Sequence, residues 1–233
     1  MRRTPLGRRR IYLLRHAEVA YFDQAGRPLP PDEVPLTARG RRQAETAGAA
    51  LAGARIDRVV TSGLPRTVQT ARLVAGPRAT VEEWPELREI APGRLADIPE
   101  DQLEAAFLGV FRGVVAGDRR FLGGETVDAL LDRVLGALGR LLADPGWDTL
   151  LAVLHGGVNR AILSFALTGR REFLGGFEQA PACINVLDVD DAGGFVVRAV
   201  NVTPWDPAYL AGRTTTMEEL WAQYRPGARQ PEP

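Results

Sequence analysis

The chain of 233 residues contains no lysine, so all 29 of its basic side chains are arginine. This absence excludes a Walker-type phosphate loop, which needs a lysine, and any mechanism that proceeds through a lysine Schiff base. The 29 basic residues are balanced by 29 acidic residues. A chain without net charge has no overall field that attracts nucleic acid or an anionic membrane surface, so we expect neither as a partner.

Cysteine, serine and long apolar runs are also scarce. The single cysteine, Cys183, cannot form an internal disulfide or a cysteine-rich metal site, which is typical of a cytoplasmic protein. The only serines, Ser62 and Ser164, lie outside any Gly-x-Ser-x-Gly motif, and Gly-x-Gly-x-x-Gly does not occur. These absences argue against a serine hydrolase and a dinucleotide-binding enzyme. No apolar run approaches the ~18 residues of a membrane helix, so we expect no membrane span.

Short apolar stretches rich in β-branched residues alternate with longer segments of helical periodicity. We predict strands near residues 11–14, 58–62, 80–84 and 149–154, and helices near 37–52, 66–75, 100–116, 125–143 and 157–168. Two later strands, CINVLDV and FVVRAVNV, are separated by the turn residues DDAGG and predict a hairpin. Almost wholly apolar strands are covered on both faces. The sequence therefore predicts a three-layer α/β/α sandwich with a mostly parallel sheet and at least one antiparallel edge strand.

No internal repeat, linker or sharp change in composition divides the chain, so we expect one domain over residues 1–233. We expect its core at about 10–205 and flexible tails at 1–9 and 226–233. The segment of about 92–125 is irregular and rich in proline, glycine and phenylalanine. We predict that it forms a cap over the functional site.

The chain has only two histidines, and each of them follows a predicted parallel strand. His16 ends IYLLRH and His155 ends TLLAVLH, where Gly156 and Gly157 permit a tight turn into the next helix. Ligands of open α/β sheets bind outside the carboxyl ends of the strands. Either histidine alone fits a structural role, but two in equivalent positions indicate a shared site. Gly156 also lets a ligand approach the backbone, which makes it a candidate substrate-binding residue.

Two arginines and a serine are expected at the same edge of the sheet. Arg15 precedes His16, while the second strand ends at Thr61 and Ser62 and is followed by Arg66 at the start of a helix. A guanidinium offers a fixed fork of donors to phosphate oxygens, and a helix amino terminus adds a favourable dipole. Arg15, Arg66 and Ser62 are therefore candidate ligands of a tetrahedral anion.

A phosphate pocket with two histidines suggests covalent phosphoryl transfer, in which one neutral imidazole attacks phosphorus and the other assists with its charge. An acid must then protonate the leaving oxygen. Glu89, in ELREIAPG, follows the third predicted strand at the same end of the sheet. A solvated loop carboxylate is the alternative interpretation of Glu89. No cluster of histidine, cysteine and paired carboxylates predicts a metal site, and we expect no cofactor.

Six segments resemble, in the same order, motifs of the histidine phosphatase superfamily, also called the phosphoglycerate mutase-like family. They span about residues 11–170 and read LLRHAE, PLTARGRRQAE, VVTSGLPRTVQTA, LREI, GGETVDALLDRV and VLHGGVNRAIL. The resemblance implies that His16 is the nucleophile that becomes phosphorylated. It also implies that Arg15, Arg66 and His155 bind the transferring phosphoryl group. Glu89 would protonate the leaving group and then help to activate water, without a metal.

Three departures from the family pattern bear on the substrate. Many members carry a small polar residue and then an asparagine that contacts the phosphate, where this chain has Val19 and Phe22. Many members also carry Phe-Gly-x-Trp-Glu-Gly, where this chain has APGRLAD at 91–97, which predicts a reshaped wall on the substrate side. The extended basic and aromatic substrate loop of the glycolytic mutases has no match.

We therefore expect a metal-independent phosphomonoesterase whose partner is a phosphorylated small molecule or a phosphoprotein. Two alternatives stay open: a mutase-type phosphotransferase, in which a substrate hydroxyl captures the phosphohistidine, and a noncatalytic phosphate-binding regulatory module. Arg119 and Arg120 of the expected cap fit either a second anionic group on the substrate or a solvated charged surface. Any oligomer is expected to be a dimer.

Overall fold

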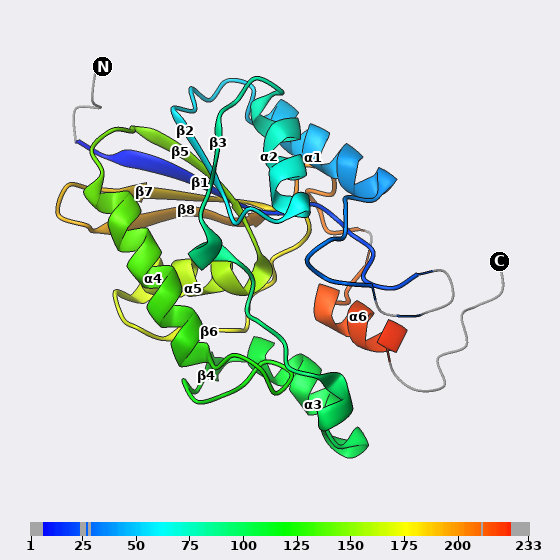
Figure 1. The fold of residues 1–233 in the computed structure, drawn as a ribbon. Coiled ribbons are helices and arrows are strands. Elements are labelled where there is room, and N and C mark those ends of the chain that lie inside the picture. The colour runs from blue at the N-terminus through cyan, green and yellow to red at the C-terminus, as the bar shows by residue number, and fades with distance from the viewer. Residues whose placement is uncertain (1–6, 24–26, 28, 211, 225–233) are drawn as a thin grey trace.

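A computed structural model describes residues 7–23, 27, 29–210 and 212–224 of the chain. Its centre is a six-stranded sheet with the order β3-β2-β5-β1-β7-β8 (Figure 1). The strands are β1 (Arg9–Arg15), β2 (Arg58–Thr61), β3 (Val81–Glu83), β5 (Thr149–Leu154), β7 (Ile184–Val189) and β8 (Phe195–Val202).

The first four strands of this order pair in parallel, whereas β7 pairs antiparallel with both β1 and β8. The β7–β8 hairpin therefore forms one edge of the sheet. Its turn is closed by the Asp190 carboxylate, which accepts from the backbone N–H groups of Ala192 and Gly194. The predicted fold, a mostly parallel sheet with antiparallel pairing at one edge, is confirmed.

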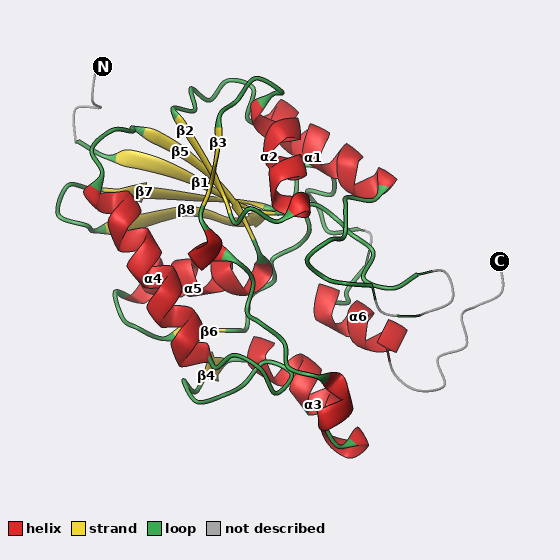
Figure 2. Cartoon of the chain, viewed as in Figure 1, coloured by secondary structure: helices red, strands yellow, loops and turns green. Residues whose placement is uncertain are grey.

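Helices cover both faces of the sheet (Figure 2). One face packs against α1 (Ala38–Ala50) and α2 (Pro65–Ala75), and the other against α4 (Val127–Ala143) and α5 (Gly156–Thr168). Alternate residues of one strand serve the two layers, because successive side chains point to opposite faces. Leu13 packs in the cluster with α4 and α5, while its neighbour Leu14 packs in the cluster with α1 and α2. This burial on both faces explains why the strands are almost wholly apolar.

The segment after β3 departs from the predicted pattern. The expected helix at 100–116 is wrong beyond its first part, because α3 spans only Leu103–Leu108 and is followed by a 3₁₀ turn and by β4 (Val114–Val115). Gly113, with φ of 59°, turns the chain out of the helical path. β4 pairs antiparallel with β6 (Phe173–Leu174) in a second, small sheet. The 3₁₀ helices of this region lie at Pro85–Leu87, Leu95–Asp97, Glu100–Gln102 and Gly109–Phe111.

The two ends of the described chain also extend beyond the predicted elements. β1 begins at Arg9, whose guanidinium donates to the carbonyls of Leu142 and Asp144 at the end of α4. A sixth helix, α6 (Thr216–Tyr224), has no counterpart in the sequence analysis and packs against α3 (Figure 1). Of the two expected tails, residues 1–6 of the first and all of the second, 226–233, lie outside the described residues. Among the described helices, none is long and apolar enough to cross a membrane.

Candidate active site

The two histidines meet at the carboxyl end of the parallel strands. Because β1 and β5 are neighbours with Arg15 opposite Leu154, the residues that follow these strands emerge side by side. The His16 backbone N–H donates to the Leu154 carbonyl at 2.9 Å. The imidazole centroids of His16 and His155 lie 5.2 Å apart, and the exposed fractions of the two residues are 3% and 0%. The structure thus brings together the two side chains that the strand ends predict to be neighbours.

A backbone carbonyl fixes the tautomer of the His16 ring. Its Nδ1 atom lies 2.8 Å from the Ala17 carbonyl oxygen. A carbonyl only accepts hydrogen bonds, so Nδ1 carries the proton and Nε2 keeps its lone pair. Burial, together with the positive charges of Arg66 and Arg15, holds the pKa of His16 well below its usual value. His16 is therefore a neutral imidazole at neutral pH.

His155 follows β5 and is held by Ser62, which follows β2. The Ser62 hydroxyl lies 2.8 Å from Nε2 of His155 and 3.2 Å from the Thr67 hydroxyl. Burial lowers the pKa of His155 as well, and the neighbouring His16 and the arginines add to the effect. Ser62, a predicted substrate-binding residue, thus contacts His155 and orients its ring. The other ring nitrogen, Nδ1, is buried without a partner among the described residues.

Arg15 and Arg66 present unused donors at this site. Both are buried, with 8% and 3% of their surface exposed. Arg15 Nη1 donates to the Gln179 carbonyl, and Arg66 Nη1 donates to the Pro31 carbonyl. Within the described part of the chain, the Nε–H groups of both arginines have no acceptor. A buried unpaired donor costs about 1–3 kcal/mol, which an anion bound between the two guanidiniums would recover.

No set of three or more histidine, cysteine or acidic side chains is placed to hold a metal ion among the described residues. Arg66 also lies in the first turn of α2, where the helix dipole favours an anion.

Glu89 is held at the start of α5 by backbone donors. The Gly157 N–H lies 3.1 Å from both carboxylate oxygens, and the Ile90 N–H donates to Oε1 at 2.9 Å. A Cβ atom on Gly157 would stand 2.6 Å from Oε1, so only glycine admits this carboxylate position. A Cβ atom on Gly156 would meet Arg160 Nη1 at 3.2 Å, Arg15 Nε at 3.6 Å and Glu89 Oε2 at 3.7 Å. The missing side chain of Gly156 therefore leaves room between two arginines and the Glu89 carboxylate.

Arg133 on α4 secures the loop that carries Glu89, and the sequence analysis gave it no role. Its guanidinium donates to the carbonyls of Glu86, Arg88 and Glu89 at 2.6–3.1 Å and pairs with Glu125 at 2.6 Å. Both partners of the pair belong to the segment GGETVDALLDRV, which the family resemblance includes. The motif was thus a signal for this contact, although it did not reveal the partners.

The loop after His16 is anchored by both helices of its layer. The Ala17 N–H donates to the Thr70 hydroxyl of α2 at 3.0 Å. Glu18 accepts at 2.8 Å from the hydroxyl of Thr37, the N-cap of α1. A Cβ atom on Gly40 would stand 2.2 Å from the Glu18 carbonyl oxygen, so α1 approaches the loop backbone closely. Glu18, the last residue of the first motif, therefore anchors the loop after His16 to the start of α1.

Two residues that depart from the family pattern also have structural partners. Val19 forms an isolated antiparallel bridge with Leu36. The Phe22 ring lies 6.4 Å from the Tyr224 ring of α6, measured between centroids. Phe22 thus makes an aromatic contact at the position where many family members carry an asparagine.

Comparison with known proteins places these features in a family. The histidine phosphatase superfamily (branch 1) matches residues 11–203. A protein of Salmonella paratyphi A named "Probable phosphoglycerate mutase GpmB" is 35% identical over 151 residues, which cover 63% of this chain and 69% of the relative.

Solved structures agree with this family and fold. A putative alpha-ribazole-5'-P phosphatase from Escherichia coli superposes with a TM-score of 0.62 at 25% identity, covering 83% of this chain and 96% of the other. A mycobacterial glucosyl-3-phosphoglycerate phosphatase has the same fold, with a TM-score of 0.66 at 24% identity, covering 83% and 99% of the two chains.

Proposed function

Because the chain belongs to branch 1 of the histidine phosphatase superfamily, we propose that it is a metal-independent phosphomonoesterase that acts through a phosphohistidine on His16. One observation carries the proposal. The free Nε2 of a neutral imidazole lies beside two buried arginines whose Nε–H groups lack acceptors in the described residues. This arrangement suits an anion that is both held and attacked.

In the first step, Nε2 of His16 attacks the phosphorus of a phosphate monoester. The new bond is N–P, the bond that breaks is P–O, and Glu89 gives its proton to the leaving oxygen. Arg15 and Arg66 hold the equatorial oxygens, over which negative charge spreads in the transition state. His155 completes the pocket beside His16.

In the second step, water attacks the phosphohistidine. Glu89, now a carboxylate, takes a proton from the water, the N–P bond breaks, and inorganic phosphate leaves His16 as a neutral imidazole. Glu89 regains its proton in the same step, so the cycle closes without any other reagent.

We propose a phosphorylated small molecule as the substrate. His16 and His155 are almost completely buried, which suits a compact ester better than a side chain on a folded protein. The cap arginines do not favour a second anionic group. Arg119 donates to the Ala105 carbonyl at 3.0 Å and Arg120 to the Gly124 carbonyl at 2.7 Å, so both support the backbone of their own segment.

A phosphoglycerate mutase-type phosphotransferase is the second candidate, because the Salmonella relative carries the name of a probable phosphoglycerate mutase. In that reaction a substrate hydroxyl, in place of water, takes the phosphoryl group from His16. The two activities are separable, because a mutase conserves the ester and needs a bisphosphate primer.

The test is hydrolysis of an aryl phosphate in the presence of a chelator, with the native chain and His16→Ala compared. We expect phosphate release by the native chain, its loss in His16→Ala, and an acid-labile phosphoryl group on the native chain after rapid quenching. A parallel assay supplies 3-phosphoglycerate with and without 2,3-bisphosphoglycerate. Isomerisation that requires the primer and exceeds hydrolysis would replace the phosphatase by the mutase. Phosphate binding without turnover in either assay would leave a noncatalytic module.

A further inference from the structure

α6 lies beyond residue 203, where the family match ends, yet it reaches the candidate active site. Its carboxyl-terminal turn packs against aromatic side chains from two other segments. The centroid of the Phe107 ring of α3 lies 5.4 Å from that of Trp221 and 5.2 Å from that of Tyr224, and Phe22 approaches Tyr224 from the loop after β1. These contacts place α6 between the cap and the loop that follows His16.

The first residue of α6, Thr216, contacts Arg15, the arginine that we propose binds phosphate. Its hydroxyl accepts from Arg15 Nη1 at 2.9 Å and lies 3.2 Å from Oε1 of Glu178. Since a carboxylate only accepts, the hydroxyl proton points to Glu178 and the oxygen lone pair points to Arg15. Thr216 therefore bridges a cation and an anion in the orientation that both require.

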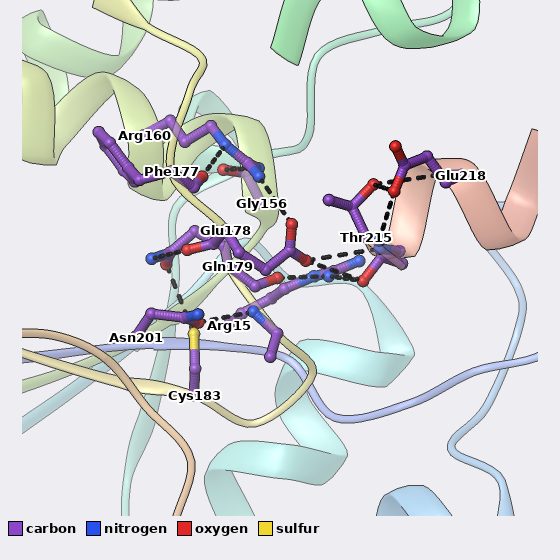
Figure 3. A network of polar contacts seen from close by, with 12 residues as sticks. Arg15, Gly156, Arg160, Phe177, Glu178, Gln179, Cys183, Asn201, Thr215 and Glu218 are labelled. Atoms are coloured by element: carbon purple, nitrogen blue, oxygen red, sulfur yellow. Dashed lines mark hydrogen bonds and ion pairs between the residues drawn. The ribbon is translucent and has the colours of Figure 1, made fainter. Parts of the chain in front are cut away.

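Glu178 is itself held from the opposite side. Its Oε2 lies 3.5 Å from Nη2 of Arg160, and Arg160 donates to the carbonyls of Phe177 and Gly156. Burial lowers the pKa of Arg160 to about 10, which leaves it charged at neutral pH. The polar contacts thus run from Arg15 through Thr216 and Glu178 to Arg160, which contacts Gly156 at the start of α5. Figure 3 shows Arg15, Glu178, Arg160 and Gly156 in this network.

The position of the Thr216 contact decides its consequence for Arg15. A guanidinium is planar, so fixing both N–H bonds of one Nη atom fixes the direction in which Nε–H points. Arg15 Nη1 is held by the Gln179 carbonyl at 2.6 Å and by Thr216, while Nε–H faces the site without an acceptor in the described residues. Without Thr216, a single contact to Nη1 remains, and the plane can turn about it.

We propose that Thr216 is a positioning residue, which holds the Arg15 guanidinium so that its Nε–H is directed at the phosphoryl group. The inference rests on the proposed function, in which Arg15 binds that group. It assigns to a segment outside the family match a part in substrate binding. The loop after β1, where Phe22 replaces the expected asparagine, gives up a polar contact to phosphate and gains a contact to the helix that supplies Thr216.

The experiment compares Thr216→Val, Thr216→Ser and Thr214→Val with the native chain. Valine keeps the volume of threonine and removes the hydroxyl, and serine restores the hydroxyl. Thr214 is exposed, and its hydroxyl contacts Glu219 at 3.3 Å, so Thr214→Val makes the same chemical change in the same segment without touching Arg15. Calorimetry with inorganic phosphate measures binding without turnover, and aryl phosphate kinetics measure KM and kcat separately.

We expect Thr216→Val to raise the Kd for phosphate and the KM by roughly 3- to 10-fold, the effect of one charge-assisted hydrogen bond among several. Thr216→Ser is expected within about 2-fold of the native chain, because it retains the same donor and acceptor. Thr214→Val is expected to bind phosphate like the native chain. A thermal unfolding midpoint unchanged by Thr216→Val would show that the loss concerns binding and not folding.

A double-mutant cycle separates positioning of Arg15 from a general effect on the site. In the Arg15→Ala background, Thr216→Val is expected to cause no further loss of phosphate affinity, because the group that it positions is gone. Native affinity in Thr216→Val, or an equal loss with and without Arg15, overturns the inference while leaving the phosphatase standing. If the native chain neither binds phosphate nor hydrolyses the ester, the proposed function itself fails.

Discussion

The contact between Glu89 and Gly157 allows the carboxylate that we propose as the general acid to be displaced without a change to Glu89 itself. In Gly157→Ala the new Cβ atom would stand 2.6 Å from Glu89 Oε1, whereas ordinary contact begins at 3.4 Å. The carboxylate must therefore retreat by about 0.8 Å. Gly157 lies inside α5 without a positive φ, so alanine suits its backbone and the cost falls on Glu89.

A shift of this size is large for proton transfer. Misplacement of a reacting group by about 1 Å costs roughly 10²-fold in rate, and complete loss of a general acid costs roughly 10²- to 10⁴-fold. We therefore expect Gly157→Ala to lower kcat/KM by about 10²-fold for an alkyl phosphate, whose leaving group needs a proton. For p-nitrophenyl phosphate, whose leaving group departs without one, we expect a loss of about 10-fold or less.

The assay is kcat/KM for the two esters, together with the Kd for inorganic phosphate. The matched control is Gly139→Ala in α4, where a Cβ atom meets nothing within 4 Å. That variant should keep full activity and gain roughly 0.5–1 kcal/mol in stability from helix propensity. Equal losses for the two esters in Gly157→Ala would refute the role of Glu89 as the acid. An unchanged rate for both would refute the steric argument.

Further predictions concern the groups around the two histidines. Burial lowers the pKa of His16 and His155, so below about pH 6.5 the unfolded chain binds more protons than the folded chain. The free energy of unfolding should therefore fall as the pH is lowered below about 6.5, by up to ~1.4 kcal/mol per histidine for each pH unit. Denaturant titrations at pH 7.0 and 5.5 check this, and His16→Gln should flatten the dependence; no dependence in the native chain would contradict neutral buried rings. Ser62→Ala removes the partner of His155 Nε2 and should lower kcat/KM about 10-fold and stability by roughly 1–2 kcal/mol, measured by kinetics and thermal unfolding. Arg133→Leu, which frees the Glu89 loop, should cost about 2–3 kcal/mol and reduce kcat, whereas Arg140→Leu, at a half-exposed ion pair, should cost less than ~1 kcal/mol and leave kcat unchanged. Equal effects of the two arginine changes would contradict a specific role for the Arg133 contacts.

The sheet and the meeting of the two histidines were predictable because both depend on local sequence patterns. A strand that is apolar on both faces must lie between two layers, and parallel strands direct their carboxyl ends to one edge. Arg15 ends β1 and His16 follows it, as His155 follows β5. Short stretches of sequence therefore place each histidine at a strand end, and the parallel pairing of β1 with β5 brings the two histidines together.

The contacts that hold these groups could not be predicted, because their partners are remote in the chain and common in type. Arg133 holds the Glu89 loop from a helix more than forty residues away. Arg15 is held by the backbone carbonyl of Gln179 and by the hydroxyl of Thr216, one of three consecutive threonines. No sequence pattern marks a backbone carbonyl or a single threonine as the partner of a remote arginine. The predicted helix at 100–116 failed for a related reason, because the β4–β6 pairing depends on residues 173–174.

The two kinds of contact divide the site into parts that can change separately. The two histidines, Arg15 and Arg66 lie at strand ends and helix starts, where the core of the sheet fixes their backbone. Arg133 of α4 and Thr216 of α6, which contact the Glu89 loop and Arg15, come from helices that pack on that core from outside. If Thr216 positions Arg15 as we propose, a change in α6 would redirect Arg15 without moving His16, whose backbone is held between β5 and α2. The family includes proteins named as a probable phosphoglycerate mutase and as a putative alpha-ribazole-5'-P phosphatase, and a division of this kind would let the substrate side differ between such proteins while the fold stays the same.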